Sequence, residues 1–358
     1  MNKQLIIFNP SIEDGGVEKN LFLTANHLSE NGMKVILISA DFKKRKEFNK
    51  NIDFIYPKKI NFENSGRYKK YFFCLILLIK EIVLRKNVLI FSFQANIYSL
   101  IVSKILGKKI IVRLNTAPIG WDHNLLKSQI YKFFINKADG IIVNSKIFKN
   151  KVKKKYNVKS ICILNPFDFE KIKSLSSIKV KNYFAKNSLK IINVGRLTKQ
   201  KDQISLLKSV NLIKHIVNFN LVIIGKGVEY KSLKKFIDVK KLNNSVKLLG
   251  YKKNPFPYIK QADIFILSSR YEGSPNVLVE AMFLGKSIIS TDCQTGPKEI
   301  LANGKYGDLF KVGDFNQLSK ILIKYKKNSF KKRNRNVLNN FNKETNCKKY
   351  FDYINKFI

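Results

Sequence analysis

Acidic residues and cysteines are scarce in this chain of 358 residues. Only 25 Asp and Glu stand against 68 Lys and Arg, so the formal net charge is +43. The four cysteines, Cys74, Cys162, Cys293 and Cys347, lie far apart, with no Cys-x-x-Cys pair and no accompanying histidine cluster. This spacing argues against a disulfide framework and against a zinc site, and it favours a reducing compartment.

Long apolar runs are missing as well. The longest spans residues 71–79 and stops at Lys80 and Glu81, whereas a membrane-spanning helix needs about 20 apolar residues. We therefore expect a buried or interfacial helix here. The first four residues run directly into a strand-like segment without a basic region, a long apolar region or a cleavage site of small residues, so no signal peptide is expected.

The excess of positive charge has three candidate explanations. The positive charge could contact nucleic-acid phosphates, or it could attract the protein to anionic lipid. It could also reflect a compositional bias toward Lys, Asn and Ile, and we prefer this third explanation. The basic clusters at 43–46, 151–155 and 331–333 lack the interleaved aromatic residues of single-strand binders. We expect no nucleic-acid partner, and we expect a cytoplasmic protein that is peripheral on the inner face of the plasma membrane.

The hydrophobic fraction of 45% and the length predict two packed domains rather than one. Short, continuous, β-branched runs alternate with helical segments, a pattern typical of parallel sheets covered by helices on both faces. These runs are residues 5–8, 35–38, 88–91, 110–112, 140–143, 189–194, 221–224, 246–249, 264–267 and 287–290. We predict two doubly wound α/β domains, at 1–168 and 188–335, with a linker at 169–187 and a C-terminal helix at 336–358.

Ligands of open parallel sheets bind beyond the carboxyl ends of the strands, so the loops there are the candidate sites. Gly15 and Gly16 follow the first strand and would let the backbone approach a phosphate or sugar, although a purely structural turn is the alternative. The loop is neither Gly-x-Gly-x-x-Gly nor a Walker loop, which argues against a dinucleotide-dependent dehydrogenase.

Two further loops follow the first strands of the second domain. The loop from Gly195 carries Arg196 and Lys201 at the start of a helix, with Asp202 as a candidate cap. Two cations at a helix N-terminus suit a diphosphate, and a solvated basic loop is the alternative. In the next loop Gly225 permits close backbone approach or forms a simple turn.

The most specific loop is 268–282, where a strand ends and a helix is expected to start near Pro275 or Asn276. Glu272 in the loop can accept hydrogen bonds from sugar hydroxyls, and Glu280 in the helix can hold a ribose diol. Between them, Gly273 and Ser274 leave backbone amides open to a phosphate. A pair of surface glutamates is the weaker alternative. In the loop after the last strand, Glu299 is either a second sugar contact or a helix cap.

Together these residues resemble the retaining glycosyltransferase family 4 of the GT-B fold, of the bacterial type that builds lipopolysaccharide, capsule and lipid-linked oligosaccharides. The matching elements occur in the family's order, at 15–18, 138–145, 165–168, 195–197, 225–227, 272–280 and 296–301. The resemblance implies two Rossmann-like domains facing across a cleft, with the C-terminal helix crossing back to the first. It also implies retaining transfer of a hexose or N-acetylhexosamine from a nucleotide-diphosphate sugar, UDP favoured, to a saccharide acceptor that is lipid-linked.

The resemblance also assigns roles to single residues. Arg196 and Lys201 would hold the donor diphosphate and stabilise the leaving group, and Glu272 would contact the transferred sugar. Glu280 would bind the ribose, and Gly16 would approach the diphosphate from the first domain. The remaining implied contacts, to sugar, phosphate or base, are Gly273, Ser274, Asn276, Val277, Tyr251 and Asn254. No Asp-x-Asp occurs, so neither a metal nor another cofactor is expected.

One position departs from the family pattern. Many members carry a histidine after the fifth strand of the first domain, where this chain has Asn115, with His123 further along. Either residue could take that place. A GT-B sugar-nucleotide epimerase and a basic nucleic-acid-binding or membrane-binding scaffold remain alternatives to a transferase.

Overall fold

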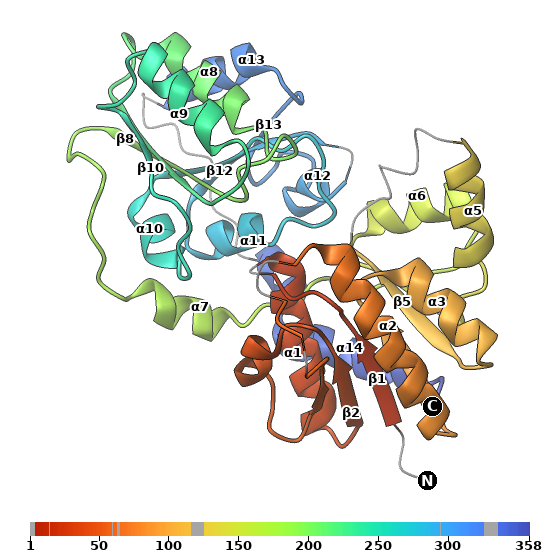
Figure 1. The fold of residues 1–358 in the computed structure, drawn as a ribbon. Coiled ribbons are helices and arrows are strands. Elements are labelled where there is room, and N and C mark those ends of the chain that lie inside the picture. Colours follow the sequence, from red (N-terminus) through yellow and green to blue (C-terminus); the bar gives the residue numbers. More distant parts are fainter. Residues whose placement is uncertain are drawn as a thin grey trace. The chain divides into compact units, whose positions relative to one another are not determined.

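The structure is a computed structural model that describes residues 4–13, 15–58, 60–62, 65–115, 125–293, 295–325 and 336–358. The chain divides into two compact units (Figure 1). Unit 1 comprises Met1–Phe167 together with Phe341–Ile358, and unit 2 comprises Asp168–Asn340. Each unit is a parallel sheet covered by helices, as the alternating pattern of the sequence predicts.

The sheet of unit 1 has seven parallel strands in the order β3-β2-β1-β4-β5-β6-β7. Five of them match predicted runs, whereas β3 and β7 were not predicted because they are short edge strands whose residues are at best half-buried. The strands are β1 (Gln4–Phe8), β2 (Lys34–Ile38), β3 (Asp53–Ile55), β4 (Val88–Ser92), β5 (Ile110–Leu114), β6 (Gly140–Val143) and β7 (Ile161–Cys162).

Alternate residues of these strands enter two hydrophobic cores, one on each face of the sheet. Ile6 and Phe8 of β1 lie in the core under α2, α3, α5 and α6, whereas Leu5 and Ile7 lie in the core under α1 and α14. Burial on both faces is why these strands are continuous apolar runs. The helices are α1 (Gly16–Glu30), α2 (Arg67–Leu84), α3 (Asn96–Ile105), α5 (Leu125–Ile135), α6 (Lys146–Tyr156) and α14 (Lys343–Asn355), with a 3-10 helix η1 (Phe42–Glu47).

The sheet of unit 2 has six parallel strands in the order β10-β9-β8-β11-β12-β13. Only β13 lies outside the predicted runs. The strands are β8 (Leu189–Val194), β9 (Phe219–Ile224), β10 (Val246–Leu248), β11 (Ile264–Leu267), β12 (Ser287–Thr291) and β13 (Asp308–Phe310). The helices are α8 (Gln203–Ile213), α9 (Tyr230–Val239), α10 (Phe256–Gln261), α11 (Asn276–Phe283), α12 (Pro297–Ile300) and α13 (Phe315–Tyr325).

The segment 169–187, which the sequence analysis assigns to a linker, begins with a helix, α7 (Phe169–Ser176), whose Ile172 is buried. The C-terminal segment starts with a 3-10 helix, η2 (Asn336–Phe341), before α14. Among the described residues, no helix combines the length and the apolar character that crossing a bilayer requires. The apolar run 71–79 lies within α2, a helix with one buried side and one exposed side.

The C-terminal helix α14 belongs to unit 1 and is held there by a buried arginine. Arg113 of β5 has no exposed surface. Its Nε donates to the hydroxyl of Tyr350 in α14 at 2.7 Å, and its terminal nitrogen Nη2 donates to the Asn165 side-chain oxygen at 2.7 Å. The guanidinium also lies 5.2 Å from the ring centroid of Phe93. Neutral oxygens and an aromatic face therefore take the place of a carboxylate beside this buried cation, whereas its other terminal nitrogen, Nη1, has no hydrogen-bond partner among the described residues.

Replacement of Tyr350 by phenylalanine tests this contact. Tyr350→Phe removes the acceptor of a buried, charged donor, and we expect the free energy of unfolding of unit 1 to fall by about 1–3 kcal/mol. Urea titration followed by far-UV circular dichroism would measure the change. Tyr68→Phe is the control, since Tyr68 is 78% exposed, and equal behaviour of the two variants would contradict a structural role for the Arg113–Tyr350 bond.

Candidate functional site

Two glycine loops at the carboxyl edge of the unit 2 sheet pack backbone against backbone. The amide of Leu197, in the loop after β8, donates to the carbonyl of Lys226, in the loop after β9, at 2.9 Å. A Cβ at Gly225 would overlap the carbonyl oxygen of Gly195, and a Cβ at Gly227 would overlap that of Leu197. Glycine is required here because any side chain would push the two loops apart.

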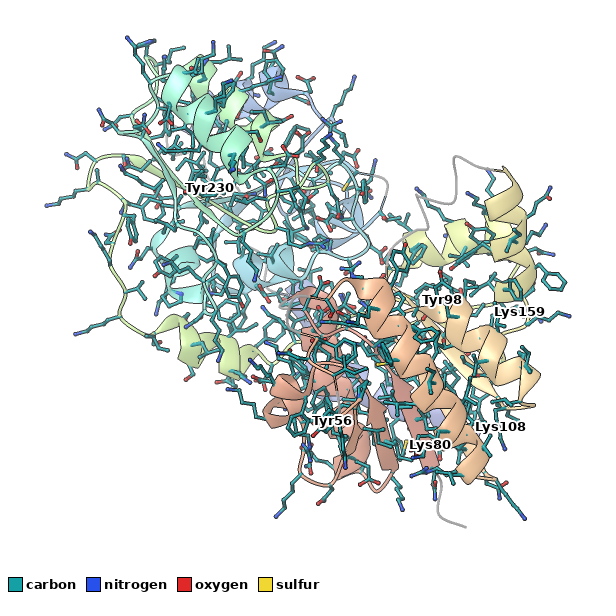
Figure 2. All side chains as sticks on the ribbon, in the orientation of Figure 1. Tyr56, Lys80, Tyr98, Lys108, Lys159 and Tyr230 are labelled. Atoms are coloured by element: carbon teal, nitrogen blue, oxygen red, sulfur yellow. The ribbon has the colours of Figure 1, made fainter. Side chains whose placement is uncertain are left out.

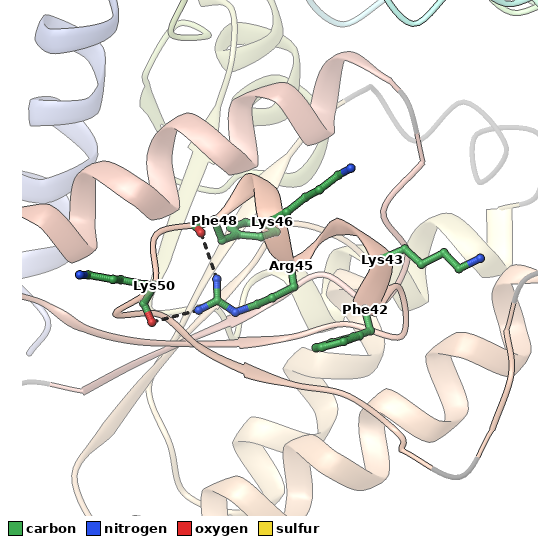
Figure 3. A pocket seen from close by; sticks show the side chains of 6 residues that line it. All are labelled: Phe42, Lys43, Arg45, Lys46, Phe48 and Lys50. Atoms are coloured by element: carbon green, nitrogen blue, oxygen red, sulfur yellow. Dashed lines mark hydrogen bonds between the residues drawn. The ribbon is translucent and has the colours of Figure 1, made fainter.

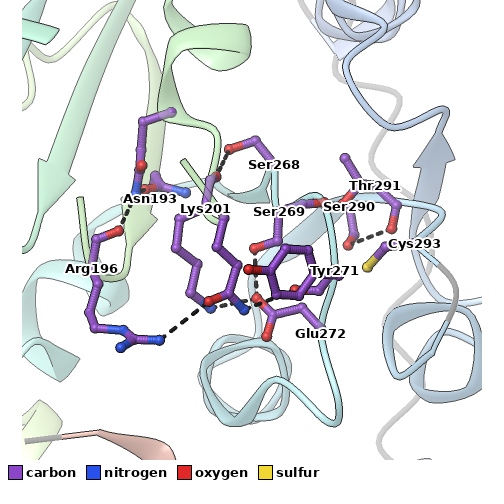
Figure 4. A network of polar contacts seen from close by, with 12 residues as sticks. Asn193, Arg196, Lys201, Ser268, Ser269, Tyr271, Glu272, Ser290, Thr291 and Cys293 are labelled. Atoms are coloured by element: carbon purple, nitrogen blue, oxygen red, sulfur yellow. Dashed lines mark hydrogen bonds and ion pairs between the residues drawn. The ribbon is translucent and has the colours of Figure 1, made fainter. Parts of the chain in front are cut away.

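Lys201 and Glu272 form an ion pair that joins the loop after β8 to the loop after β11 (Figure 4). The two residues are 71 positions apart in the chain. The side chains are 15% and 8% exposed, so the pair is largely removed from water. The structure thus brings together two of the three residues that the sequence analysis assigns to catalysis.

Hydroxyl groups of serine and threonine hold Glu272 in place. These residues were not predicted as site residues from the sequence. The Ser269 hydroxyl donates to the same carboxylate oxygen, Oε1, at 2.6 Å. The Thr295 hydroxyl donates to the Glu272 backbone carbonyl, and the Thr291 hydroxyl donates to the carbonyl of Ser269 at 2.6 Å. One carboxylate oxygen is therefore engaged by a cation and a hydroxyl before any ligand binds.

Backbone contacts hold the same two loops in register. The Ser268 hydroxyl donates to the Lys201 carbonyl at 2.8 Å, and the Arg270 amide donates to the Gln200 carbonyl at 2.8 Å. The Gln200 side chain in turn donates to the Tyr271 carbonyl at 3.0 Å. These contacts position Lys201 beside Glu272 independently of the ion pair itself.

Arg196, the third residue assigned to catalysis, remains on the surface at the start of the same loop. Its guanidinium donates to the Gln200 side-chain oxygen at 3.3 Å (Figure 4). Asp202 takes the N-cap position of α8, but its side chain does not cap the helix: it accepts from the Ser205 hydroxyl at 3.0 Å and pairs with Arg270 at 3.2 Å. The site therefore presents an exposed cation beside a buried ion pair.

Helix α11 begins at Asn276, where the sequence predicts it. Asn276 and Glu280 are buried on this helix, Gly273 is buried ahead of it, and Ser274 and Val277 are half-buried. Gly296, at the N-cap of α12, has a φ of +83°, and a Cβ there would lie 2.5 Å from the Gly273 carbonyl oxygen. The loop after β12 therefore packs on the loop after β11 and fixes the approach to α11. Glu299 lies in the first turn of α12.

The two residues that are candidates for contact with the nucleotide base differ in their surroundings. Tyr251 is exposed after β10, with the ammonium of Lys226 5.0 Å from its ring centroid. Asn254 bonds within its own unit instead, since its amide donates to the Leu175 carbonyl at 2.8 Å and its oxygen accepts from the Phe256 amide at 3.2 Å. Tyr251 thus lies exposed beside a lysine, whereas Asn254 organises the start of α10.

The remaining candidates lie in unit 1. Gly15 is the N-cap of α1 and Gly16 its first residue. A Cβ at Gly15 would lie 2.7 Å from a carboxylate oxygen of Glu18. Burial raises the pKa of Glu18 to about 7. Asn115 follows β5, and its amide donates to the Phe93 carbonyl at 2.8 Å; His123 lies outside the described residues.

Two other features of the described residues supply no reactive group to this site. Burial raises the pKa of the Cys293 thiol to about 12, so this thiol beside Thr291 is not a nucleophile near neutral pH. A surface hollow of about 550 Å³ on unit 1 is lined by residues of the 3-10 helix η1 and of the turn that follows it (Figure 3). These residues are Phe42, Lys43, Arg45, Lys46, Phe48 and Lys50. Its Arg45 donates to the carbonyls of Phe48, Asn49 and Lys50 and so closes a turn instead of facing a ligand.

Comparison with known proteins identifies the class of this fold and site. The chain is similar over 99% of its length to all of a solved Anabaena protein, HepE, in complex with UDP and glucose, at 17% identity and a TM-score of 0.77. Two parallel-sheet Rossmann-like domains of this kind define the GT-B fold. The model of Glycosyltransferase Family 4 matches residues 14–171, and the model described as Glycosyl transferases group 1 matches residues 176–343. The chain belongs to these glycosyltransferase families.

Two curated relatives are glycosyltransferases by name. An uncharacterized glycosyltransferase of Methanocaldococcus jannaschii is 38% identical over 51% of this chain and 50% of its own. The N-acetylgalactosamine-N,N'-diacetylbacillosaminyl-diphospho-undecaprenol 4-alpha-N-acetylgalactosaminyltransferase of Campylobacter jejuni is 29% identical over 62% of each chain. The match thus spans about half to three fifths of these relatives' length.

Separation of the Lys201–Glu272 pair should cost stability. We expect Lys201→Met to lower the free energy of unfolding of unit 2 by about 3 kcal/mol, because it leaves a buried carboxylate without its cation. Adding Glu272→Gln should restore part of that loss, and urea titration of both single variants and the double variant would measure the coupling.

The exposed ion pair of Lys234 with Asp238 in α9 provides the control. Lys234→Met should leave the urea midpoint nearly unchanged, because water screens this pair. If Lys201→Met behaved in the same way, the buried pair would have no organising role.

The raised pKa of Glu18 predicts a pH dependence of stability. Between the unfolded value near 4.5 and the folded value of about 7, the folded state binds more protons than the unfolded state, so stability falls as the pH rises through this window. Full ionisation of Glu18 should cost up to roughly 3 kcal/mol. Glu18→Gln should remove this slope between pH 4.5 and pH 7, as measured by urea midpoints at several pH values. Glu30→Gln, at an exposed position of the same helix, should retain it.

Proposed function

We propose that the protein transfers a hexose or N-acetylhexosamine from a UDP-sugar to a saccharide acceptor with retention of configuration. The observation that carries this proposal is the arrangement of Lys201, Glu272 and the exposed Arg196 on adjoining loops at the carboxyl edge of the unit 2 sheet. Such an edge is where open α/β sheets hold their ligands. The UDP of the Anabaena complex supports the choice of nucleotide.

Each charged group has a distinct task in this reaction. Arg196 and Lys201 neutralise the diphosphate and stabilise it as the leaving group. Glu272 keeps carboxylate lone pairs for hydroxyls of the transferred sugar, while Glu280 accepts from the ribose diol. The acceptor oxygen attacks on the face from which the diphosphate leaves, and the departing phosphate oxygen takes the acceptor's proton, so retention needs no separate base.

In this proposal cations of the chain hold the diphosphate. The sequence has no Asp-x-Asp. Arg196 and Lys201 supply the positive charge that a bound cation would otherwise contribute.

The acceptor in this proposal is a lipid-linked saccharide at a membrane surface, in the assembly of a bacterial surface glycan. The support is the Campylobacter relative, whose name specifies a diphospho-undecaprenol-linked acceptor. The net charge of +43 would favour residence at the anionic inner face of a plasma membrane.

A thermal-shift panel of UDP, GDP, ADP and CMP tests the donor. UDP should raise the melting temperature with concentration as mass action requires, and Arg196→Ala should abolish the shift, because it removes a cation from the diphosphate. Lys231→Ala, which removes one exposed positive charge from α9, should leave the shift intact. A response to another nucleotide would replace UDP as the donor, and no response to any of them would contradict the proposal.

Transfer itself is measured with a radiolabelled UDP-sugar and a diphospho-lipid saccharide. Glu272→Gln should lower kcat/KM by roughly 10- to 100-fold, because a charge-assisted hydrogen bond to the sugar is lost. Conversion of the donor sugar without any transfer would indicate an epimerase instead.

A further inference from the structure

Helix α2 of unit 1 carries a stripe of exposed apolar side chains. Five large apolar residues recur at helical spacing on its outer side. At 100° per residue they fall within an arc of about 80°. They are Tyr68, Phe72, Ile76, Ile79 and Val83. A water-facing helix surface normally carries polar residues in this arc, so the stripe requires a partner other than water.

The opposite side of α2 is already used for packing on the sheet. Cys74, Leu78 and Ile82 are buried in the core that also contains Ile6 and Phe8. Lys70 is buried beside them and pairs with Asp41 at 2.6 Å. The helix therefore cannot turn its apolar stripe inward, because the inward face has its own complement of buried residues.

The apolar surface continues onto the two neighbouring helices. Helices α3 and α5 lie beside α2 in turn on the same face of the sheet (Figure 1). They add exposed apolar side chains, namely Tyr98 and Ile105 from α3 and Ile130 and Phe133 from α5. We name the exposed side of α2, α3 and α5 the three-helix face. An apolar surface spread over three adjoining helices exceeds the scattered exposed residues of ordinary proteins.

Positive charge accompanies the apolar residues of the three-helix face. Its helices carry seven Lys and Arg but a single carboxylate, Glu81, which is buried and paired with Arg85. Three of the cations pair with other segments, as Arg67 with Glu13, Lys70 with Asp41 and Lys104 with Asp139. Lys69, Lys80 and Lys132 occupy exposed positions beside the apolar residues. Figure 2 shows Lys80, Tyr98 and Lys108 on this part of unit 1.

A general compositional bias does not explain this distribution. Helices α1 and α14, which cover the other face of the same sheet, contain four carboxylates and four lysines. Among the helices that cover the sheet, α2, α3 and α5 are thus basic while α1 and α14 are balanced, and the 3-10 helix η1 carries a separate basic cluster. Apolar side chains bordered by lysine and free of exposed carboxylates match the interface of an anionic bilayer, where the apolar residues enter the acyl region and the cations meet the headgroups.

We propose that the three-helix face is a membrane-docking surface that inserts Phe72, Ile76 and Val83 into an anionic lipid monolayer. Its use in catalysis rests on the lipid-linked acceptor proposed above. Docking on this face would hold unit 1 against the surface in which such an acceptor is anchored, so that the enzyme searches for it in two dimensions instead of three.

Vesicle flotation of the full chain tests the docking surface. Wild-type protein should float with vesicles of phosphatidylcholine and phosphatidylglycerol and remain behind with phosphatidylcholine alone. The triple variant Phe72→Ser, Ile76→Ser and Val83→Ser should lose at least tenfold in partitioning at low and at moderate salt. The pair Lys69→Gln and Lys80→Gln should lose roughly 30-fold at low salt, in proportion to the two charges removed.

Matched controls come from unit 2. Val228, Val239 and Ile178 are 85%, 64% and 52% exposed, and their replacement by serine should change partitioning less than twofold. Lys231→Gln with Lys235→Gln removes the same charge as the α2 pair at other exposed positions. Equal losses in these controls would overturn the proposal and assign membrane attraction to diffuse charge.

Two further measurements separate the alternatives. A wild-type dimer, seen in analytical ultracentrifugation and lost in the triple serine variant, would overturn the proposal by assigning the three-helix face to a second copy of the chain. The UDP thermal shift should persist in every variant, which shows that the fold is intact. Vesicle docking without any nucleotide response would contradict the proposed donor chemistry while supporting the docking surface.

Discussion

Parallel pairing of the strands places every carboxyl end at one edge of each sheet, and the candidate site follows from that constraint. Parallel strands need covering on both faces, so their side chains are committed to the two cores and cannot serve a ligand. Polar groups can converge only in the loops beyond the edge. In unit 2 the loops after β8 and β11 converge there because their strands are neighbours in the sheet, and the Lys201–Glu272 pair joins them.

The sequence predicted the architecture well because burial on both faces leaves long β-branched runs. It missed β3, β7 and β13, whose two or three residues lack such a run. It also identified Arg196, Lys201 and Glu272 as charged residues in strand-end loops, but not the hydroxyls of Ser269, which contacts the Glu272 carboxylate, and Thr295, which contacts its backbone carbonyl. Serine and threonine occur throughout the chain, so only three-dimensional proximity distinguishes these two.

The net charge of the chain becomes informative only when the charged residues are assigned to particular helices. The composition alone left three explanations for the positive charge, namely a compositional bias, a membrane partner and a nucleic-acid partner. A net charge does not show where on the protein the charged residues lie. On the sheet of unit 1 the helices of one face balance their charges, while those of the other are basic and carry the exposed apolar stripe. An attraction to anionic lipid would therefore orient the protein as well as concentrate it.

The return of the chain at Phe341 bears on the order in which the protein is made. The Phe167 amide donates to the Phe341 carbonyl at 2.8 Å, so the chain leaves unit 1 and re-enters it at one point, with unit 2 inserted between. During translation, unit 2 is complete while unit 1 still lacks α14. The buried Arg113 receives its Tyr350 partner only after the whole of unit 2 has been made. Unit 1 is therefore begun before unit 2 and completed after it, so a chain cut short before α14 contains every residue of unit 2 but lacks the helix that closes unit 1.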